Sequence, residues 1–372
     1  MKSVNGHEII SLFETLAPKE LAEEGDKIGL QIGRLNQKVD KVMVTLDVLE
    51  EVVDEAIEKG VNLIIAHHPP LFRSLKAVRT DTVQGRMIEK LIKNDISVYA
   101  AHTNLDVAKG GVNDLLAEAL GLKETKLLLP TYKEKLKKIA VFVPEEDAAK
   151  VRKALGDAGA GHIGNYSHCS FSMEGTGRFL PGEGTNPHIG EQGILEEVNE
   201  VKIESIYPSH LEKKVMKALF TSHPYEEVAY DVIPLENEGE SLGLGRVGKL
   251  DSPMSLEKFA AYTKEKLQVD NVRVTGNLTD SIQKVAVLGG DGNKFIHHAK
   301  FSGADVFVTG DLYYHTAHDA MMLGLNVLDA GHHIEKVMKE GVARWMTEKS
   351  REKGMAVEYL VSKVNTDPFT FL

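Results

Sequence analysis

Two stretches of the chain, one in its first third and one in its last, share the same pattern. In each, short apolar runs are followed directly by polar residues. The run 42–45 corresponds to 285–288, and each is followed within a few residues by an aspartate. A helical stretch and a glycine turn then precede a second apolar run, which ends at His68 in the first stretch and at Asp311 in the second. The repetition predicts two halves of similar topology that face each other, although two βαβ units can also look alike by chance.

Within each half, short apolar runs alternate with amphipathic stretches. In the first half, strands are predicted at 41–48, 61–68 and 96–106, with helices between them at 49–59 and 87–94. Strand, helix, strand in this order is typical of a parallel sheet with helices on both faces. Ligands bind at the carboxyl ends of the strands in such sheets, so the polar residues at these ends are the first candidates for a functional site.

The segment between the two halves follows a different pattern. Strands are predicted at 136–143, 168–181, 196–208 and 228–235, and helices at 145–157 and 211–221. The order β-α-β-β-α-β is that of the ferredoxin-like fold. We therefore predict an α/β protein in which two similar α/β halves form one core, plus an inserted ferredoxin-like α+β domain. The predicted divisions are 1–126 for the first half of the core, 127–241 for the insert and 242–372 for the second half.

Charge and cysteine content exclude several classes of protein. The 372 residues include 44 Lys and Arg against 55 Asp and Glu, a formal net charge of −11, which argues against a general nucleic-acid binder but leaves room for one local basic pocket. No apolar stretch approaches the ~18–20 residues of a membrane span. Cys169 is the only cysteine, so an internal disulfide is excluded and a reducing compartment is favoured. We expect a cytoplasmic protein without membrane segments.

Histidines and carboxylates follow three of the predicted strands. His67 and His68 come directly before two prolines, Asp106 lies just beyond the next strand, and His332 and Glu335 follow the matching strand of the second half. Adjacent histidines on an extended segment point in opposite directions, so each would serve its own metal unless the chain turns, and a pair without metal is the alternative. Imidazole and carboxylate without thiolate suit Zn²⁺, Mn²⁺ or Fe²⁺. These residues predict a metal site between the two halves.

Several motifs together resemble a known family. They are AHHPPLF (66–72), AHTNLDVAKGGVN (101–113), GRVGKL (245–250), TGDLYYHTAHDA (309–320) and DAGHHIEK (329–336). This combination is similar to the NIF-three-like dinuclear-metal family, whose members often carry the name GTP cyclohydrolase type I homologue. The stretch SHPYEEVAYDV (222–232) resembles the PII-like or CutA-like module of some members. The resemblance implies two divalent metal ions, a bridging role for Asp106, and the ligands His67, His68, Asp106, His332 and Glu335.

The remaining histidines near these motifs are interpreted one by one. The family separates its last histidine and glutamate by four residues, but His332 lies three residues before Glu335, so His333 stays an alternative ligand. His332 is favoured because it follows a glycine. His102 is interpreted as a supporting partner or a substrate contact, and His315 as a candidate for the pocket. His297, His298 and His318 lie in helical stretches and are interpreted as solvated or core residues.

A two-metal site indicates hydrolytic chemistry, because paired ions activate water and stabilise an oxyanion. The family name points to hydrolytic opening of the guanine ring of GTP. The chain has no P-loop, so phosphate groups would depend on separate cations such as Arg73, Lys76 or Arg246. The rival hypothesis is a non-enzymatic metal-binding scaffold or regulatory protein whose insert senses a small molecule. The resemblance also implies a ring-like homo-oligomer, a hexamer, acting on a small molecule or nucleotide.

Overall fold

The structure, a computed structural model, describes residues 4–372 and divides into two compact units. Of the described residues, unit 1 comprises 4–132 and 242–372, and unit 2 comprises 133–241. Two long strands, β5 (Lys123–Pro144) and β8 (Tyr230–Ser255), each contribute residues to both units. The predicted division at residue 127 therefore falls inside β5.

The first sheet of unit 1 has five strands in the order β1-β4-β3-β2-β13. Strands β2, β3, β4 and β13 run parallel, and β1 pairs antiparallel with β4 at the edge. The elements of this half are α1 (Gly6–Phe13), a 3₁₀ turn (Lys19–Leu21), β1 (Gly29–Ile32), β2 (Lys41–Thr45), α2 (Glu50–Glu58), β3 (Leu63–Ala66), α3 (Val83–Lys93), β4 (Ser97–Ala100), α4 (Thr103–Val107) and α5 (Val112–Ala119).

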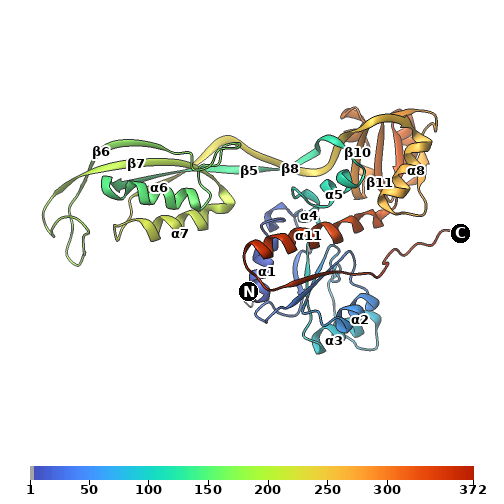
Figure 1. Ribbon diagram of the computed structural model, residues 1–372, viewed down its shortest axis with the longest axis horizontal. Coiled ribbons are helices and arrows are strands. Elements are labelled where there is room, and N and C mark those ends of the chain that lie inside the picture. The colour runs from blue at the N-terminus through green and yellow to red at the C-terminus, as the bar shows by residue number, and fades with distance from the viewer. Residues whose placement is uncertain (1–3) are drawn as a thin grey trace. The chain divides into compact units, whose positions relative to one another are not determined.

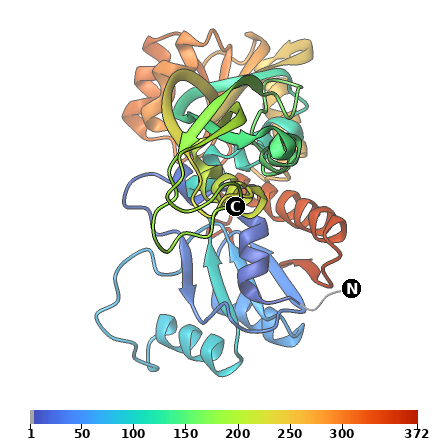
Figure 2. The same cartoon turned by 90° about the vertical axis from the view of Figure 1, so that its left-hand side faces the viewer.

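Continuous apolar runs form these strands because both faces of the sheet are buried. Met43, Ile64 and Val98 pack in one cluster with α2 and α3, whereas the chain neighbours Val42 and Val44 join a cluster on the other face. Successive side chains of a strand point to opposite faces, so both clusters draw on the same three strands. Figure 1 shows α2 and α3 on one side of this sheet and α1 and α11 (Val337–Glu352) on the other, and Figure 2 gives the view turned by 90°.

The second sheet of unit 1 has a similar order, β8-β10-β11-β12-β9, but β8 pairs antiparallel with β10, whereas β13 runs parallel to β2. Its three central strands are parallel, and β9 pairs antiparallel with β12, as β1 does with β4. The elements are α8 (Leu256–Leu267), β9 (Arg273–Thr275), β10 (Ser281–Asp291), a 3₁₀ turn (Asn293–Phe295), α9 (Ile296–Phe301), β11 (Val306–Gly310), α10 (Tyr314–Met322), β12 (Asn326–Asp329), η5 (His332–Lys336), α11 and β13 (Glu358–Val361). A mixed α/β fold with two sheets is thus confirmed.

The two halves exchange their last helices. Helix α5 of the first half packs against β10 of the second sheet, and α11 of the second half packs against β2 of the first. Strand β13 follows α11 and pairs with β2, where Tyr359 lies opposite Val42. The largest apolar cluster accordingly includes Leu116 from α5, Met338 from α11 and the β10 residue Val285. The halves therefore share one core.

Unit 2 contains the remaining elements around its own apolar cluster. After β5 come a 3₁₀ turn (Glu145–Asp147), α6 (Ala148–Asp157), β6 (Phe171–Phe179), β7 (Glu196–Pro208), a 3₁₀ turn (Ser209–Leu211) and α7 (Glu212–Ser222), followed by β8. The strand order is β6-β7-β5-β8, and β7 runs antiparallel to both β5 and β6. Ile139, Val141, Ile203 and Leu219 are among the fully buried members of the cluster.

Helix lengths and compositions bear on membrane insertion. Across residues 4–372, the helices are all too short or too polar to cross a bilayer.

Candidate metal centre

Polar side chains meet in unit 1 where parallel strands end. His67 and His68 directly follow β3, and Asp106 lies on the short helix α4 after β4. His332 and Glu335 lie on η5, which follows β12 of the second sheet. The carboxyl ends of strands from both sheets thus contribute to one cluster, in the position where open α/β sheets bind ligands.

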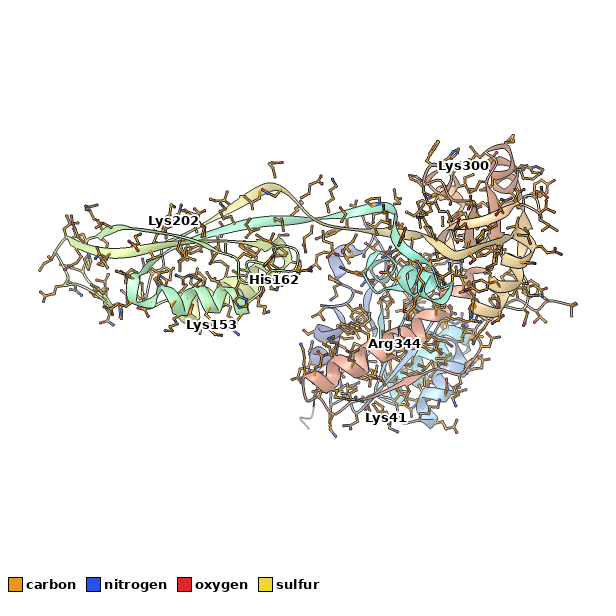
Figure 3. All side chains as sticks on the ribbon, turned by 45° about the horizontal axis from the view of Figure 1, so that its top comes forward. Lys41, Lys153, His162, Lys202, Lys300 and Arg344 are labelled. Carbon is orange, nitrogen blue, oxygen red and sulfur yellow. The ribbon has the colours of Figure 1, made fainter. Side chains whose placement is uncertain are left out.

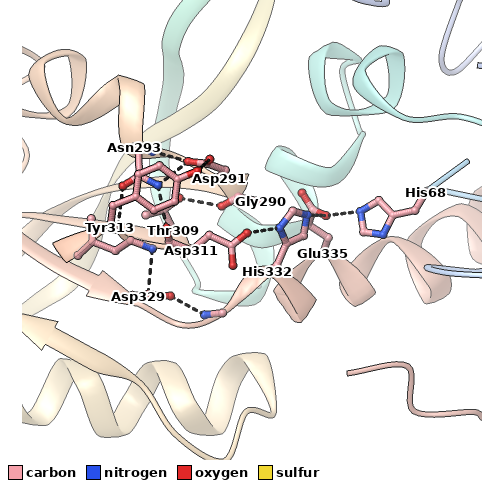
Figure 4. A network of polar contacts seen from close by, with 12 residues as sticks. His68, Gly290, Asp291, Asn293, Thr309, Asp311, Tyr313, Asp329, His332 and Glu335 are labelled. Atoms are coloured by element: carbon pink, nitrogen blue, oxygen red, sulfur yellow. Dashed lines mark hydrogen bonds and ion pairs between the residues drawn. The ribbon is translucent and has the colours of Figure 1, made fainter. Parts of the chain in front are cut away.

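One carboxylate oxygen lies at the middle of this cluster. Oε2 of Glu335 lies 3.0 Å from Nε2 of His68 and 3.3 Å from Nε2 of His332. It also lies 3.6 Å from Nε2 of His67. Figure 4 shows Glu335 between the imidazoles of His68 and His332, which come from strand ends far apart in the sequence. Glu335 is buried, and the three ring nitrogens all face it.

The opposite nitrogen of each imidazole is held by an acceptor. Nδ1 of His68 lies 2.7 Å from Oδ1 of Asp47, and Nδ1 of His332 lies 2.7 Å from Oδ2 of Asp311. Nδ1 of His67 lies 2.8 Å from the carbonyl oxygen of Ala101. When Nδ1 donates its proton to such an acceptor, Nε2 keeps a free lone pair for a metal ion. The three histidines are therefore oriented as ligands usually are.

Two buried polar atoms in the cluster lack hydrogen-bond partners. Within residues 4–372, neither Nε2 of His67 nor Oδ1 of Asp106 is hydrogen-bonded, and the two atoms are 3.6 Å apart. Leaving such atoms unpaired in a protein interior is costly, so each needs an explanation. A cation between them would satisfy both. The donor set, imidazole and carboxylate only, fits Zn²⁺, Mn²⁺ or Fe²⁺.

Three groups of side chains have donor atoms close enough to hold an ion. They are His67, His68 and His102; His68, His332 and Glu335; and His67, Asp106 and Glu335. All five residues predicted from the sequence belong to these groups. Glu335 belongs to two of them, whereas Asp106 belongs to one. Glu335 therefore offers a ligand atom to more of these groups than Asp106 does.

The surroundings shift the pKa values of the histidines in opposite directions. Burial lowers the pKa of His67 to about 3. Burial would also lower the pKa of His68, but hydrogen bonds to Asp47 and Glu335 outweigh it and raise the pKa to about 10. The hydrogen bond to Glu335 raises the pKa of His332 to about 9. Without metal, His68 and His332 are thus protonated at neutral pH and His67 is not.

The two buried carboxylates of the cluster are affected differently. Burial, followed by the charge of Glu335, raises the pKa of Asp106 well above its usual range. Burial also opposes ionisation of Glu335, but hydrogen bonds from His332 and His68 outweigh it and lower its pKa. Divalent ions would replace the two imidazole protons as the charge that balances Glu335.

Glycines at the end of β10 leave the space that Glu335 occupies. A Cβ atom at Gly290 would lie 2.8 Å from Oε1 of Glu335, and one at Gly289 would lie 3.0 Å from the same oxygen. The backbone of Gly290 also has a φ angle of +65°, a conformation that residues other than glycine rarely adopt. The sequence pattern marked the strand ends but not these glycines, because nothing in their spacing indicates what approaches them.

His102 is closer to the cluster than the sequence suggested. It belongs to one of the three possible metal groups, and its Nδ1 lies 2.9 Å from Oδ1 of Asp26. Burial would raise the pKa of Asp26, but hydrogen bonds from Thr103 and His102 outweigh it and lower the pKa. Asp26 lies in an irregular segment without a motif, so sequence reasoning had no signal for it.

His333 faces away from the cluster. Its Nε2 lies 3.3 Å from Oγ1 of Thr366, and its Nδ1 lies 3.9 Å from a carboxylate oxygen of Asp367. The Thr366 hydroxyl in turn donates to Oδ2 of Asp47 at 2.5 Å. His333 thus contacts the C-terminal segment, while His332 points toward Glu335.

A cavity of about 800 Å³ opens onto the cluster. Its lining includes His68, His102 and His332, together with side chains of the C-terminal segment 365–369. His315, predicted for the pocket, is exposed on α10 and is not part of this lining. Arg246, one of the cations on which phosphate binding could depend, is buried, has its Nη2 2.8 Å from Oδ2 of Asp114, and is not part of this lining.

Comparisons with known proteins agree over the whole chain. The profile of the family described as Duf34/NIF3 (NGG1p interacting factor 3) matches residues 4–368. A Bacillus subtilis (strain 168) relative named GTP cyclohydrolase 1 type 2 homolog is 62% identical over 371 residues, covering 100% of both chains. A solved Bacillus cereus protein related to NIF3 has a TM-score of 0.94 and 63% identity, again over 100% of both chains. A solved Staphylococcus aureus protein has a TM-score of 0.77 and 33% identity, with 100% of both covered.

Proposed function

Because this chain belongs to the Duf34/NIF3 family, we propose that it is a metal-dependent hydrolase with a dinuclear centre. Its substrate is a nucleotide or another small molecule, in keeping with relatives named GTP cyclohydrolase 1 type 2 homolog. The metal ions are two per chain and are Zn²⁺, Mn²⁺ or Fe²⁺. The proposed ligands are His67, His68, Asp106, His332 and Glu335.

The observation that carries this proposal is the pair of buried, unsatisfied atoms beside Glu335. Nε2 of His67 and Oδ1 of Asp106 have no hydrogen-bond partner within residues 4–372. A structural network would pair its buried polar atoms, whereas a metal site leaves them free for an ion. Hydrogen bonds from the ligand histidines to Asp47 and Asp311 support the same interpretation.

Each part of the site has a distinct task in this proposal. Two bound divalent ions would supply an activated water and stabilise developing negative charge on the substrate. Asp47 and Asp311 hold the Nδ1 protons of His68 and His332, which keeps both rings in one orientation. Glu335 places its carboxylate between those rings. His102, held by Asp26 and lining the cavity, is positioned to contact the substrate.

Metal content tests the proposal directly. Elemental analysis of the purified protein should find about two divalent ions per chain. Asp106→Ala should keep about one, because Asp106 belongs to one possible group and Glu335 to two. The exposed Asp251→Ala is the matched control and should keep both. Loss of both ions from Asp106→Ala would instead support Asp106 as the bridging ligand that the family resemblance implies, and a wild-type protein without metal would refute the centre.

Metal binding should release protons and strengthen as pH rises. His68 and His332, with pKa values of about 10 and about 9, must each lose a proton before Nε2 can bind an ion. Affinity should therefore increase about tenfold per pH unit for each proton displaced, up to about pH 9. Calorimetry at pH 7 in buffers of different ionisation enthalpy should count about two protons, and about one in His68→Gln.

The same shifts set the pH dependence of the metal-free fold. The folded state raises the pKa values of both histidines above the ordinary 6.5. The contribution of the two protonated histidines to the free energy of unfolding is therefore fully present below about pH 6.5. It is lost as pH rises through the folded-state values. If the protein took up no protons when its metal ions were removed, this account of His68 and His332 would be contradicted.

A second candidate function is a metal-binding regulatory protein or scaffold. A cavity of about 710 Å³ in unit 2, lined in part by Phe142, Phe179 and Tyr225, favours a small-molecule-sensing role for that unit. Turnover of a nucleotide and phosphoester panel with Mn²⁺ or Zn²⁺ separates the two hypotheses. Turnover that disappears in His68→Ala supports the hydrolase, whereas binding without turnover supports the scaffold.

Three further features belong to the proposal. Residues 127–241 form an independent ferredoxin-like insert, in keeping with the strand order β6-β7-β5-β8 and a separate apolar cluster. The chain assembles into a homo-oligomer, a hexamer, as the family resemblance implies. It works in the cytoplasm, where its single cysteine, Cys169, would stay reduced.

A further inference from the structure

The cavity above the metal centre has two kinds of wall. One is apolar and is formed by Leu46, Leu49, Pro69, Phe72, Pro368 and Phe369. Phe72 and Phe369 are 62% and 68% exposed, so large aromatic surfaces remain available to a ligand. The ring of Phe72 lies 6.4 Å from that of His102, at the edge of the metal-binding groups. Such a wall suits a flat ring that stacks on aromatic faces.

The second wall is acidic. Asp47, Asp311 and Asp367 line the cavity, and Asp106 and Glu335 lie beneath it in the metal-binding groups. No lysine or arginine is among the lining residues that the structure describes. These five carboxylates would more than balance the charge of two divalent ions. Apart from the ions themselves, a loaded site therefore offers no positive charge that would offset the repulsion between these carboxylates and a phosphate chain.

Three cations elsewhere in unit 1 have partners outside the cavity. Figure 3 labels Lys41, Lys300 and Arg344, which contact Glu358, the carbonyl oxygen of Gly324 and Glu118, respectively. Arg73 and Lys76, the other cations on which phosphate binding could depend, are exposed and are not part of the lining. Sites that hold a nucleotide's phosphate chain commonly add lysine, arginine or a cradle of backbone amides to any bound metal ions.

We propose that this site takes an uncharged heterocyclic base or its nucleoside, and that it discriminates against the same compound carrying phosphate groups. The proposal rests on the proposed function, since the metal ions hold the reacting end of the ligand. The ring stacks on the apolar wall near Phe72 and Phe369, and the acidic wall repels an attached phosphate. The substrate class thus differs from the triphosphate that the relatives' name contains.

Binding by the metal-loaded full-length chain tests this class. The metal content is measured first, and guanosine, GMP and GTP are then titrated by calorimetry, with the metal content measured again afterwards. Guanosine should bind at least about tenfold more tightly than GMP, because a like-charge contact costs more than 1.4 kcal/mol. Tighter binding of GMP or GTP than of guanosine would overturn the proposal, as would a loaded protein that binds none of them. A protein without metal would instead be a failure of the proposed function.

Variants test whether the charge of the cavity lining determines the preference for guanosine over GMP. Leu49→Arg adds a cation to the lining and should bring the affinity for GMP up to that for guanosine. Leu278→Arg is the matched control, because Leu278 is similarly exposed but lies outside the cavity, and it should leave the ratio unchanged. The double substitution Arg73→Ala and Lys76→Ala should also leave the affinity for GMP unchanged. A loss of GMP binding in that double variant would show that these two cations do hold phosphate.

Discussion

Glu335→Gln should lose both metal ions while the protein stays folded. Oε2 of Glu335 lies within 3.6 Å of Nε2 in three histidines, and the residue belongs to two of the possible metal groups. The amide has the size of the carboxylate but lacks its charge, and its NH₂ group would face ring nitrogens that must stay free. Loss of a residue that supports a single ligand costs 10–100-fold in metal affinity, so loss of this shared one should cost at least about 100-fold.

Helix α11 offers a matched control for this change. Glu340→Gln makes the same chemical change at an exposed position on α11 and should keep normal metal content. Elemental analysis and calorimetric titration give stoichiometry and affinity, and circular dichroism monitors the fold. If Glu335→Gln retained two ions at normal affinity, Glu335 would be excluded as a ligand.

Gly310→Ala should disrupt the centre from a position without a functional group. A Cβ atom at Gly310 would lie 2.7 Å from the backbone nitrogen of His332 and 2.8 Å from the carbonyl carbon of Gly331. Backbone cannot turn aside as a side chain can, so the segment leading into η5 must move. We expect a loss of roughly 1–3 kcal/mol in the free energy of unfolding, as for other overpacked sites. Metal affinity should fall with it, because His332 and Glu335 are displaced together.

The matched control for this change is Gly175→Ala. Gly175 also lies in a strand, but its Cβ would have no neighbour within 4 Å. Chemical denaturation of metal-free protein measures the stability, and elemental analysis measures the metal. Equal behaviour of the two variants would mean that η5 tolerates displacement and that close packing at Gly310 does not position the ligands.

Local patterns were sufficient to predict most of the central strands. The runs 42–45 and 285–288 are almost entirely apolar because helices cover both faces of each sheet, and such runs are readable without knowing their neighbours. The edge strands β1 and β9 are short and carry no comparable signal. The exchange of α5 and α11 was also unpredictable, because the periodicity of a helix identifies its apolar face but not the sheet that covers it.

Strand ends were equally informative about the candidate site. Polar residues after β3 and β4 share one edge because these strands are parallel neighbours, and the repetition predicts that the matching strand end, after β12, faces them. His68 and Glu335, 267 residues apart, do lie 3.0 Å from each other. Asp26 and Thr366 could not be identified in this way. They reach the site from irregular segments, whose course depends on packing rather than on any repeating pattern.

The pairing of β13 with β2 also affects how the chain folds while it is being synthesised. Until Glu358–Val361 has emerged from the ribosome, β2 has an unpaired edge, and α11 has yet to cover Val42 and Val44. An open apolar strand edge is a template for pairing with other chains. The cluster inside unit 2 uses only residues made much earlier. We therefore expect the middle of the nascent chain to fold before its beginning, and the first half to be the part that most needs protection by a chaperone.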